Sequence, residues 1–91
     1  MLRFRLNESI YKTNTKDDIL DSIVTITNAY SNDRLFSELR KFLQDIEDIE
    51  LKDILTVLIN ESDANNDDSE MVYSILSSEI ESYYRLKGVN I

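Results

Sequence analysis

The sequence contains no cysteine, histidine or proline and only one glycine. Without cysteine the chain has no disulfide, no thiolate ligand for zinc and no thiol nucleophile, and without histidine it has neither an imidazole ligand nor an imidazole base. A single glycine and no proline exclude glycine-rich phosphate loops and proline-rich linkers. The composition therefore favours a binding protein that is not an enzyme and that needs no cofactor or metal.

The chain has 91 residues, of which 42% are hydrophobic, and this length fits one small domain. No apolar run in the sequence approaches the about 20 residues that span a bilayer. The amino terminus has too few apolar residues for a signal peptide. We therefore expect one domain over residues 1–91 that stays in the cytosol and does not insert into a membrane.

Two apolar periodicities divide the chain. In residues 1–14, Leu2, Phe4 and Leu6 alternate with arginines, which indicates an extended or partly ordered lead-in. From Thr15 onward the apolar residues recur every three or four positions, the period of a helix with one buried face. The sequence thus predicts an all-α fold.

The stripes and their capping residues predict four helices. The first covers about residues 16–29 after an N-cap at Thr15, the second follows a cap at Ser31 or Asn32 and runs to about residue 47, and a short third covers about residues 51–60. The fourth follows a cap at Asp68 or Ser69 and ends near Gly88. A polar loop over residues 61–68 would join the last two, and the four helices fit a compact bundle that is a monomer or a weak dimer.

Acidic residues are concentrated in one part of the chain. Residues 35–82 hold 13 Asp and Glu against three Lys and Arg, whereas the whole chain has a net charge of −8. This balance argues against binding to a nucleic-acid backbone and favours a basic protein partner. Each acid alone fits a solvated face, but together they form a stripe able to attract such a partner. The stripe comprises Glu38, Asp45, Glu47, Asp48, Glu50 and Asp53.

The predicted polar loop has part of a calcium-binding pattern. Asp63, Asn65 and Asp67 place oxygen ligands at alternate positions, as a calcium loop does at its start. The pattern then fails, because Asp68 stands where the turn needs glycine and Ser74 where a glutamate closes the shell. A capped turn explains these residues better, and no carboxylate pair is singled out for catalysis.

Positions along most of the chain resemble a known family. They are Ser9, Ile10, residues 15–20, Val24, Ile26, Asn28 and Ala29, then Leu35, Leu39 and Phe42, then residues 53–55 and 67–70, and last Tyr84, Arg85 and Gly88. In order, they are similar to the first helix, the second helix, the opening of the third helix, the acidic loop before the fourth helix and the carboxyl end in the colicin and pyocin nuclease immunity proteins. Where that family has a tyrosine pair followed by proline, this chain has Thr56, Val57 and Leu58.

The resemblance implies an antiparallel four-helix bundle with a short third helix and no reaction of its own. It also implies that the second helix supplies specificity for the partner and the third supplies shared affinity. Asp53 corresponds to the family's acidic hot spot in the third helix. With the acidic stripe, this predicts a partner surface at Glu38, Leu39, Asp45, Asp48, Asp53, Thr56 and Val57.

Three functions fit the sequence. The first is a bacteriocin immunity protein that neutralises a basic toxin domain, such as a nuclease, by binding it. The second is a small acidic regulatory protein, such as a phage or plasmid inhibitor that mimics the charge of DNA. The third is an immunity protein that protects the membrane of a Gram-positive bacterium. A neighbouring toxin gene would separate the first and third from the second.

Overall fold

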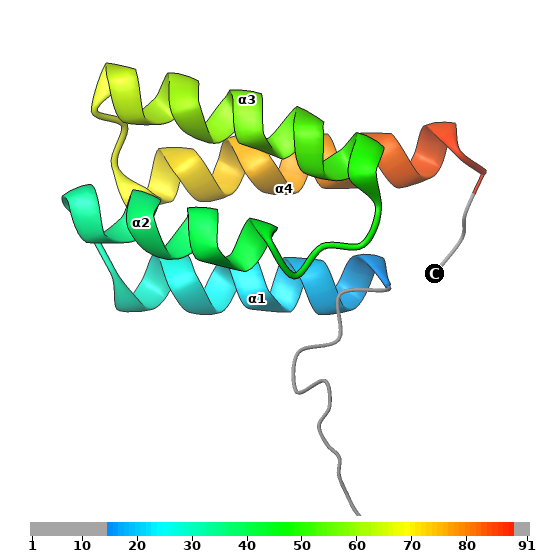
Figure 1. Ribbon diagram of the computed structural model, residues 1–91, viewed down its shortest axis with the longest axis horizontal. Helices are drawn as coiled ribbons and strands as arrows, with labels where there is room; N and C mark the ends of the chain where they lie inside the picture. The colour runs from blue at the N-terminus through cyan, green and yellow to red at the C-terminus, as the bar shows by residue number, and fades with distance from the viewer. Residues whose placement is uncertain (1–14, 89–91) are drawn as a thin grey trace, which may run out of the picture.

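Four α-helices account for nearly all of residues 15–88, the part of the chain described by the computed structural model. They are α1 (Lys16–Ala29), α2 (Asn32–Leu43), α3 (Ile49–Asn65) and α4 (Ser69–Leu86) (Figure 1). Residues 15–88 contain no strand, so the predicted all-α class is confirmed. The lead-in predicted over residues 1–14 lies outside the described residues.

The helices form an antiparallel bundle. Each helix packs against the next along the chain, and α4 closes the bundle by packing against α1 (Figure 1). As a result, α1 and α3 lie diagonally opposite each other, with α2 and α4 between them. The outer side of α2 is therefore bordered by α1 on one edge and by α3 on the other.

Leucine and isoleucine side chains fill the centre of the bundle. Each one contributes about 1.5 to 3 kcal/mol by leaving water, so together they account for most of the favourable energy of folding. Those with no solvent exposure recur at helical spacing on every helix: Ile19, Ile23, Leu35, Leu39, Leu51, Leu55, Ile59, Leu76 and Ile80. Among the described helices, none combines the length and the apolar character needed to cross a bilayer.

Side-chain caps fix where three of the helices begin. The Thr15 hydroxyl and the Asp68 carboxylate each accept a hydrogen bond from the backbone N–H three residues on, at 3.2 and 2.9 Å. Thr15 was predicted as a cap and Asp68 was one of two candidates with Ser69, and the bounds predicted for α1 are confirmed. Asp48 caps α3 in the same way, at 3.2 Å from the Leu51 N–H. A cap of this kind typically stabilises a helix by about 1 kcal/mol.

The predicted end of the second helix was wrong. α2 ends at Leu43, four residues before the predicted position. The chain continues into a tight turn in which Asp45 N–H donates to Phe42 C=O at 2.9 Å and Ile46 N–H donates to Leu43 C=O at 3.1 Å. Ile46 is only 3% exposed, so it contributes to the core from the connection and not from the helix.

The predicted third helix was too short. α3 has 17 residues, starts at Ile49 because Asp48 is its cap, and runs to Asn65. Its last turns are polar, but Ser62, whose small side chain is only 2% exposed, allows them to pack against the bundle. The residue that follows the helix, Asn66, is its C-cap and has a left-handed backbone at φ 57°. The predicted polar loop over residues 61–68 is thus reduced to residues 66–68.

Candidate partner-binding surface

The seven residues predicted to contact a partner lie in four different environments. Asp53, Thr56 and Val57 belong to α3, and Glu38 belongs to α2. Asp45 and Asp48 lie on the connection between these helices. Leu39 has no exposed surface, because its place in the apolar stripe of α2 points it into the core. Leu39 therefore offers no side chain to a partner.

The outer face of α3 carries a stripe of three exposed side chains, Ile49, Asp53 and Val57. They are spaced four residues apart, which puts them above one another on one side of the helix. Ile49 is 66% exposed and Val57 is 56% exposed, so an acid lies between two accessible apolar side chains. We call these three residues the α3 stripe.

The sequence did not single out Ile49 as a surface residue. It lies between the predicted second and third helices, and only the extension of α3 back to residue 49 brings it into register with Asp53 and Val57. The signal in the sequence was the four-residue spacing of Ile49, Asp53 and Val57, together with the acidic cap at Asp48. Thr56 is half-buried beside the stripe, and its hydroxyl donates to the Lys52 carbonyl at 2.7 Å.

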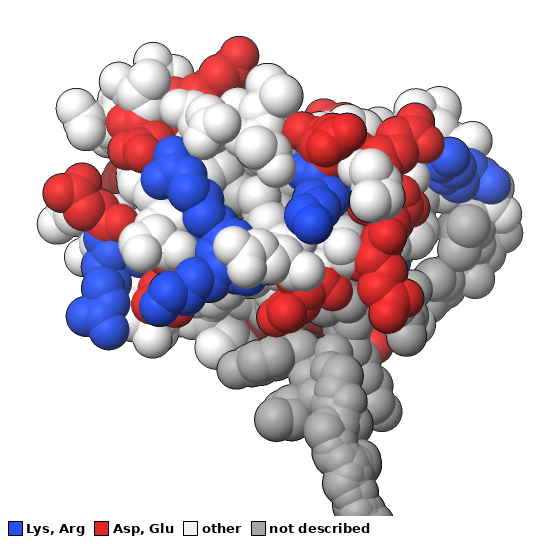
Figure 2. All heavy atoms as spheres, in the orientation of Figure 1, with Lys and Arg blue, Asp and Glu red and all other residues white. Residues whose placement is uncertain are grey.

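Four exposed acids surround the connection between α2 and α3. They are Asp45, Glu47, Asp48 and Glu50, and we call them the acidic link. Figure 2 shows acidic side chains gathered over this connection. Because Glu50 follows Ile49 directly, the acidic link adjoins the α3 stripe at the start of α3. The negatively charged acidic link and the partly apolar α3 stripe thus form one continuous surface.

Asp48 has a structural role in addition to its charge. One carboxylate oxygen caps α3, and the other accepts a hydrogen bond from the Tyr83 hydroxyl at 2.7 Å, which ties the link to α4. This hydrogen bond holds the pKa of Asp48 below its usual value. Burial first, and then the hydrogen bond to Asp48, raises the pKa of Tyr83. Tyr83 therefore stays protonated and remains a donor.

Glu50 makes a second connection between the acidic link and α4. Its carboxylate lies 2.9 Å from the ammonium group of Lys87, and this contact raises the pKa of Lys87. Both side chains are about half exposed, at 64% and 49%. An exposed pair of this kind contributes little to stability and leaves Glu50 open to exchange its partner.

Glu38 is held on α2 by two cations of its own helix. Its carboxylate lies 3.7 Å from Arg34 and 3.5 Å from Lys41, and the side chain is only 20% exposed. Because both cations are largely exposed, this part of α2 presents a mixed charge, not an acidic face. The predicted acidic stripe along α2 therefore reduces to the acidic link at the end of the helix.

Arg40 connects α2 to the last turns of α3. Its guanidinium donates to the Asn60 side chain at 2.9 Å and to the Asp63 carboxylate at 2.8 Å. Asp63 thus belongs to a helix and pairs with a cation, whereas the calcium pattern would need it in a loop. Among the described residues, no group of three or more His, Cys, Asp or Glu is arranged to hold a metal ion.

The α3 stripe and the acidic link are suited to binding a protein. A carboxylate between two apolar side chains can pair with an Arg or Lys of a partner while its neighbours exclude water from the pair. Comparisons with models of protein families, with curated proteins and with solved structures find no match to this chain. The two surface features and the resemblance of the sequence are therefore what indicate a function for this chain.

Proposed function

We propose that this chain is an immunity protein that binds a basic toxin domain in the cytosol and neutralises it by blocking access to its substrate. The observation that carries this proposal is the position of Asp53 between the exposed side chains of Ile49 and Val57, next to the acidic link. The family resemblance points to a nuclease as the toxin. Binding alone is the activity, and the chain supplies no chemical step.

The two features act at different ranges. The acidic link attracts a basic surface from a distance of about 8 Å, the screening length at physiological salt, and so speeds the encounter. The α3 stripe acts on contact, where Ile49 and Val57 lose water and Asp53 pairs with a cation. Attraction sets the rate of association, and the desolvated contact sets the rate of dissociation.

On this face the chain has aliphatic side chains where the immunity family that it resembles has aromatic ones. The positions of the tyrosine pair hold Thr56 and Val57, and Thr56 is half-buried with its hydroxyl bonded inside α3. Val57 and Ile49 are therefore the side chains left to supply apolar contact on this face. Aliphatic side chains bury less area than tyrosine, so each one is expected to contribute less to affinity than the family's anchors.

The first experiment identifies the partner and measures its release. The tagged full chain is co-purified from its producing cells, the bound protein is identified, and dissociation rates are measured for wild type and variants. We expect a basic toxin domain whose lethality is suppressed by co-expression. Asp53→Ala should speed dissociation about 30-fold, since an interfacial acid contributes about 2 kcal/mol or more. Stability should change by less than about 0.5 kcal/mol, because Asp53 is exposed.

Asp17→Asn is the matched control for Asp53→Ala. Asp17 is also an exposed acid of a helix, but it lies on α1, diagonally opposite α3. Its dissociation rate should equal that of wild type. A partner that is acidic, or a DNA-binding regulator without toxicity, would contradict the proposal. An unchanged dissociation rate for Asp53→Ala with lowered stability would show that Asp53 is structural.

A further inference from the structure

The ammonium group of Lys87 lies in a small site where the acidic link meets α4. It is 2.9 Å from a carboxylate oxygen of Glu50, and it lies over the Tyr83 ring, 5.3 Å from the ring centre. The Tyr83 hydroxyl is 2.7 Å from the Asp48 carboxylate and 3.5 Å from that of Glu50. Two carboxylates and an aromatic ring favour a cation. We call Asp48, Glu50 and Tyr83 the cation site, and Lys87 shows that it holds a cation.

The fold holds two members of the cation site in place without help from Lys87. Tyr83 is only 6% exposed and its hydroxyl donates to one carboxylate oxygen of Asp48. The other oxygen of Asp48 caps α3 through the Leu51 N–H. Because these contacts do not involve Lys87, the site keeps its shape when the lysine leaves it.

Lys87 can leave the cation site at little cost. Its side chain is 49% exposed, and an exposed ion pair contributes little to stability. The backbone of Lys87 is held separately, since its N–H donates to the Tyr83 carbonyl at 3.1 Å. Rotation of the side chain alone therefore vacates the site, and α4 does not have to unwind.

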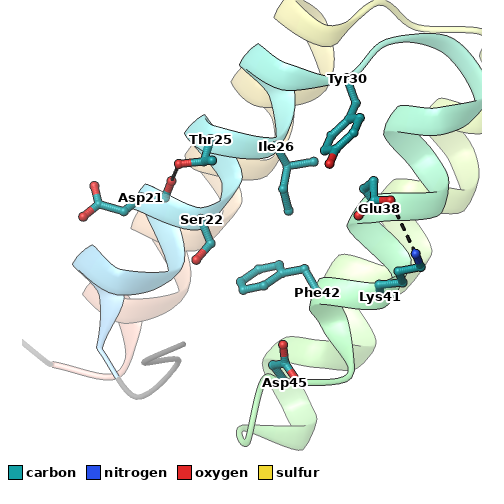
Figure 3. Close-up of a pocket in the computed structure, with 9 residues that line it drawn as sticks. All are labelled: Asp21, Ser22, Thr25, Ile26, Tyr30, Glu38, Lys41, Phe42 and Asp45. Carbon is teal, nitrogen blue, oxygen red and sulfur yellow. Dashed lines mark hydrogen bonds and ion pairs between the residues drawn. The ribbon is translucent and has the colours of Figure 1, made fainter. Parts of the chain in front are cut away.

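The lysine–glutamate pair at the cleft between α1 and α2 has a different origin. Figure 3 shows this pair, Lys41 and Glu38, on α2, where the charged groups lie 3.5 Å apart. Residues three positions apart on a helix are neighbours in any fold. Lys87 and Glu50 instead belong to different helices and lie 37 positions apart in the sequence. Their contact therefore depends on the packing of the bundle.

We propose that Lys87 is an internal competitor, which occupies the place on the acidic link that an arginine of the basic partner takes on binding. Arginine displaces lysine because its planar guanidinium donates two hydrogen bonds to a carboxylate and stacks on an aromatic ring, whereas an ammonium group is a point charge. Glu50 directly follows Ile49, so this arginine lies beside the contact with the α3 stripe. The inference rests on the proposed function and adds a residue of the chain that weakens binding.

The probe for this proposal is capped arginine, Nα-acetyl-arginine amide, and its control is capped citrulline, which has nearly the same shape but no charge. Each is titrated into the isotopically labelled full chain, and nuclear magnetic resonance follows the signals of the Tyr83 ring and the Glu50 side chain. Lys87→Gln should strengthen the binding of capped arginine about threefold, as removal of one exposed ion pair does. Lys87→Arg keeps the charge but puts a tethered guanidinium in the site, so it should weaken this binding below that of wild type.

Arg85→Gln is the matched control for Lys87→Gln. Arg85 is an exposed cation in the last turn of α4, so its loss changes the net charge by the same amount. Its affinity for capped arginine should stay close to that of wild type. Equal strengthening by the two variants would overturn the proposal, because net charge and not occupancy of the site would explain it. Equal affinity of wild type and Lys87→Gln, or equal binding of capped citrulline, would also overturn it.

Binding of the toxin separates this inference from the proposed function. Lys87→Gln should lower the dissociation constant of the toxin about threefold, whereas Arg85→Gln should leave it close to that of wild type. If capped arginine behaves as expected but Asp53→Ala does not change toxin release, the proposed function fails and the competition at the cation site stands. If Asp53→Ala speeds toxin release but Lys87→Gln does not strengthen toxin binding, the inference about Lys87 alone fails.

Discussion

The side chain of Asp48 has two roles, one in the charge of the surface and one in the stability of the fold. Asp48 contributes charge to the acidic link, yet its carboxylate also caps α3 and accepts the Tyr83 hydroxyl proton at 2.7 Å. Removing it would therefore alter stability as well as binding. Asp53, in contrast, is exposed on the outer face of α3, so its replacement tests binding more directly.

Tyr83→Phe should lower the free energy of unfolding by about 1 kcal/mol at neutral pH, because it removes one hydrogen bond to a carboxylate. The pKa of Asp48 is depressed in the folded state, so the stability from this bond is present above its usual value of 3.8 and is lost as the pH falls through the folded pKa. Denaturant unfolding at pH 7 and at pH values below 4 measures the effect. A difference between variant and wild type that persists unchanged in acid would contradict this assignment.

The sequence predicted several individual residues correctly, and its errors have a physical cause. Thr15 and Asp68 were found as caps because a cap depends on neighbours only three residues away. The bond between Asp48 and Tyr83 joins residues 35 positions apart, and no local pattern signals it. Leu39 was placed in the partner surface by resemblance, although its own spacing in the apolar stripe predicts the buried position that it occupies.

Among the helices, the predicted bounds agreed best with the structure where a capping residue comes directly before an apolar stripe. α1 has a cap at its start and apolar residues along one face, and both of its ends were predicted. α3 was cut short because its polar last turns resemble a loop in composition. A helix at the surface can carry polar residues on its outer face. The small buried side chain of Ser62 and the ion pair between Asp63 and Arg40 are therefore sufficient for α3 to continue to Asn65.

Asn66 tests how α3 is terminated. Its left-handed backbone, at φ 57° and ψ 39°, suits asparagine or glycine and strains a residue with an ordinary side chain. Asn66→Ala should lower the free energy of unfolding by about 1 kcal/mol, and Asn66→Gly should leave it unchanged or raise it. Asn65→Ala is the control, because Asn65 is still helical and alanine is the better helix former. Thermal and denaturant unfolding of the three variants decide the matter, and equal losses for Asn66→Ala and Asn66→Gly would argue against this account.

For the whole molecule, the arrangement of charge is a consequence of where the helices end. The fold gathers part of the acids that the sequence distributes over residues 35–82 at one place. Glu38, Glu50, Asp63 and Glu81 each lie within 4 Å of a Lys or Arg, and Figure 2 shows acidic side chains gathered over the α2–α3 connection. Part of the net charge of −8 is thus concentrated at the acidic link.

The rate of association with a basic partner should depend on this local charge. Raising the salt concentration from about 0.01 M to 1 M shortens the screening length from about 30 Å to 3 Å, so the association rate should fall steeply while dissociation changes little. Glu47→Gln removes one exposed charge of the acidic link and should slow association at low salt only. Glu70→Gln, with the same loss of net charge in the first turn of α4 at the other end of the bundle (Figure 1), should slow it less. Stopped-flow measurements of the purified pair give both rates. If Glu47→Gln and Glu70→Gln slow association equally, total charge and not the acidic link attracts the partner, and if salt has no effect, the acids serve only to keep the protein in solution.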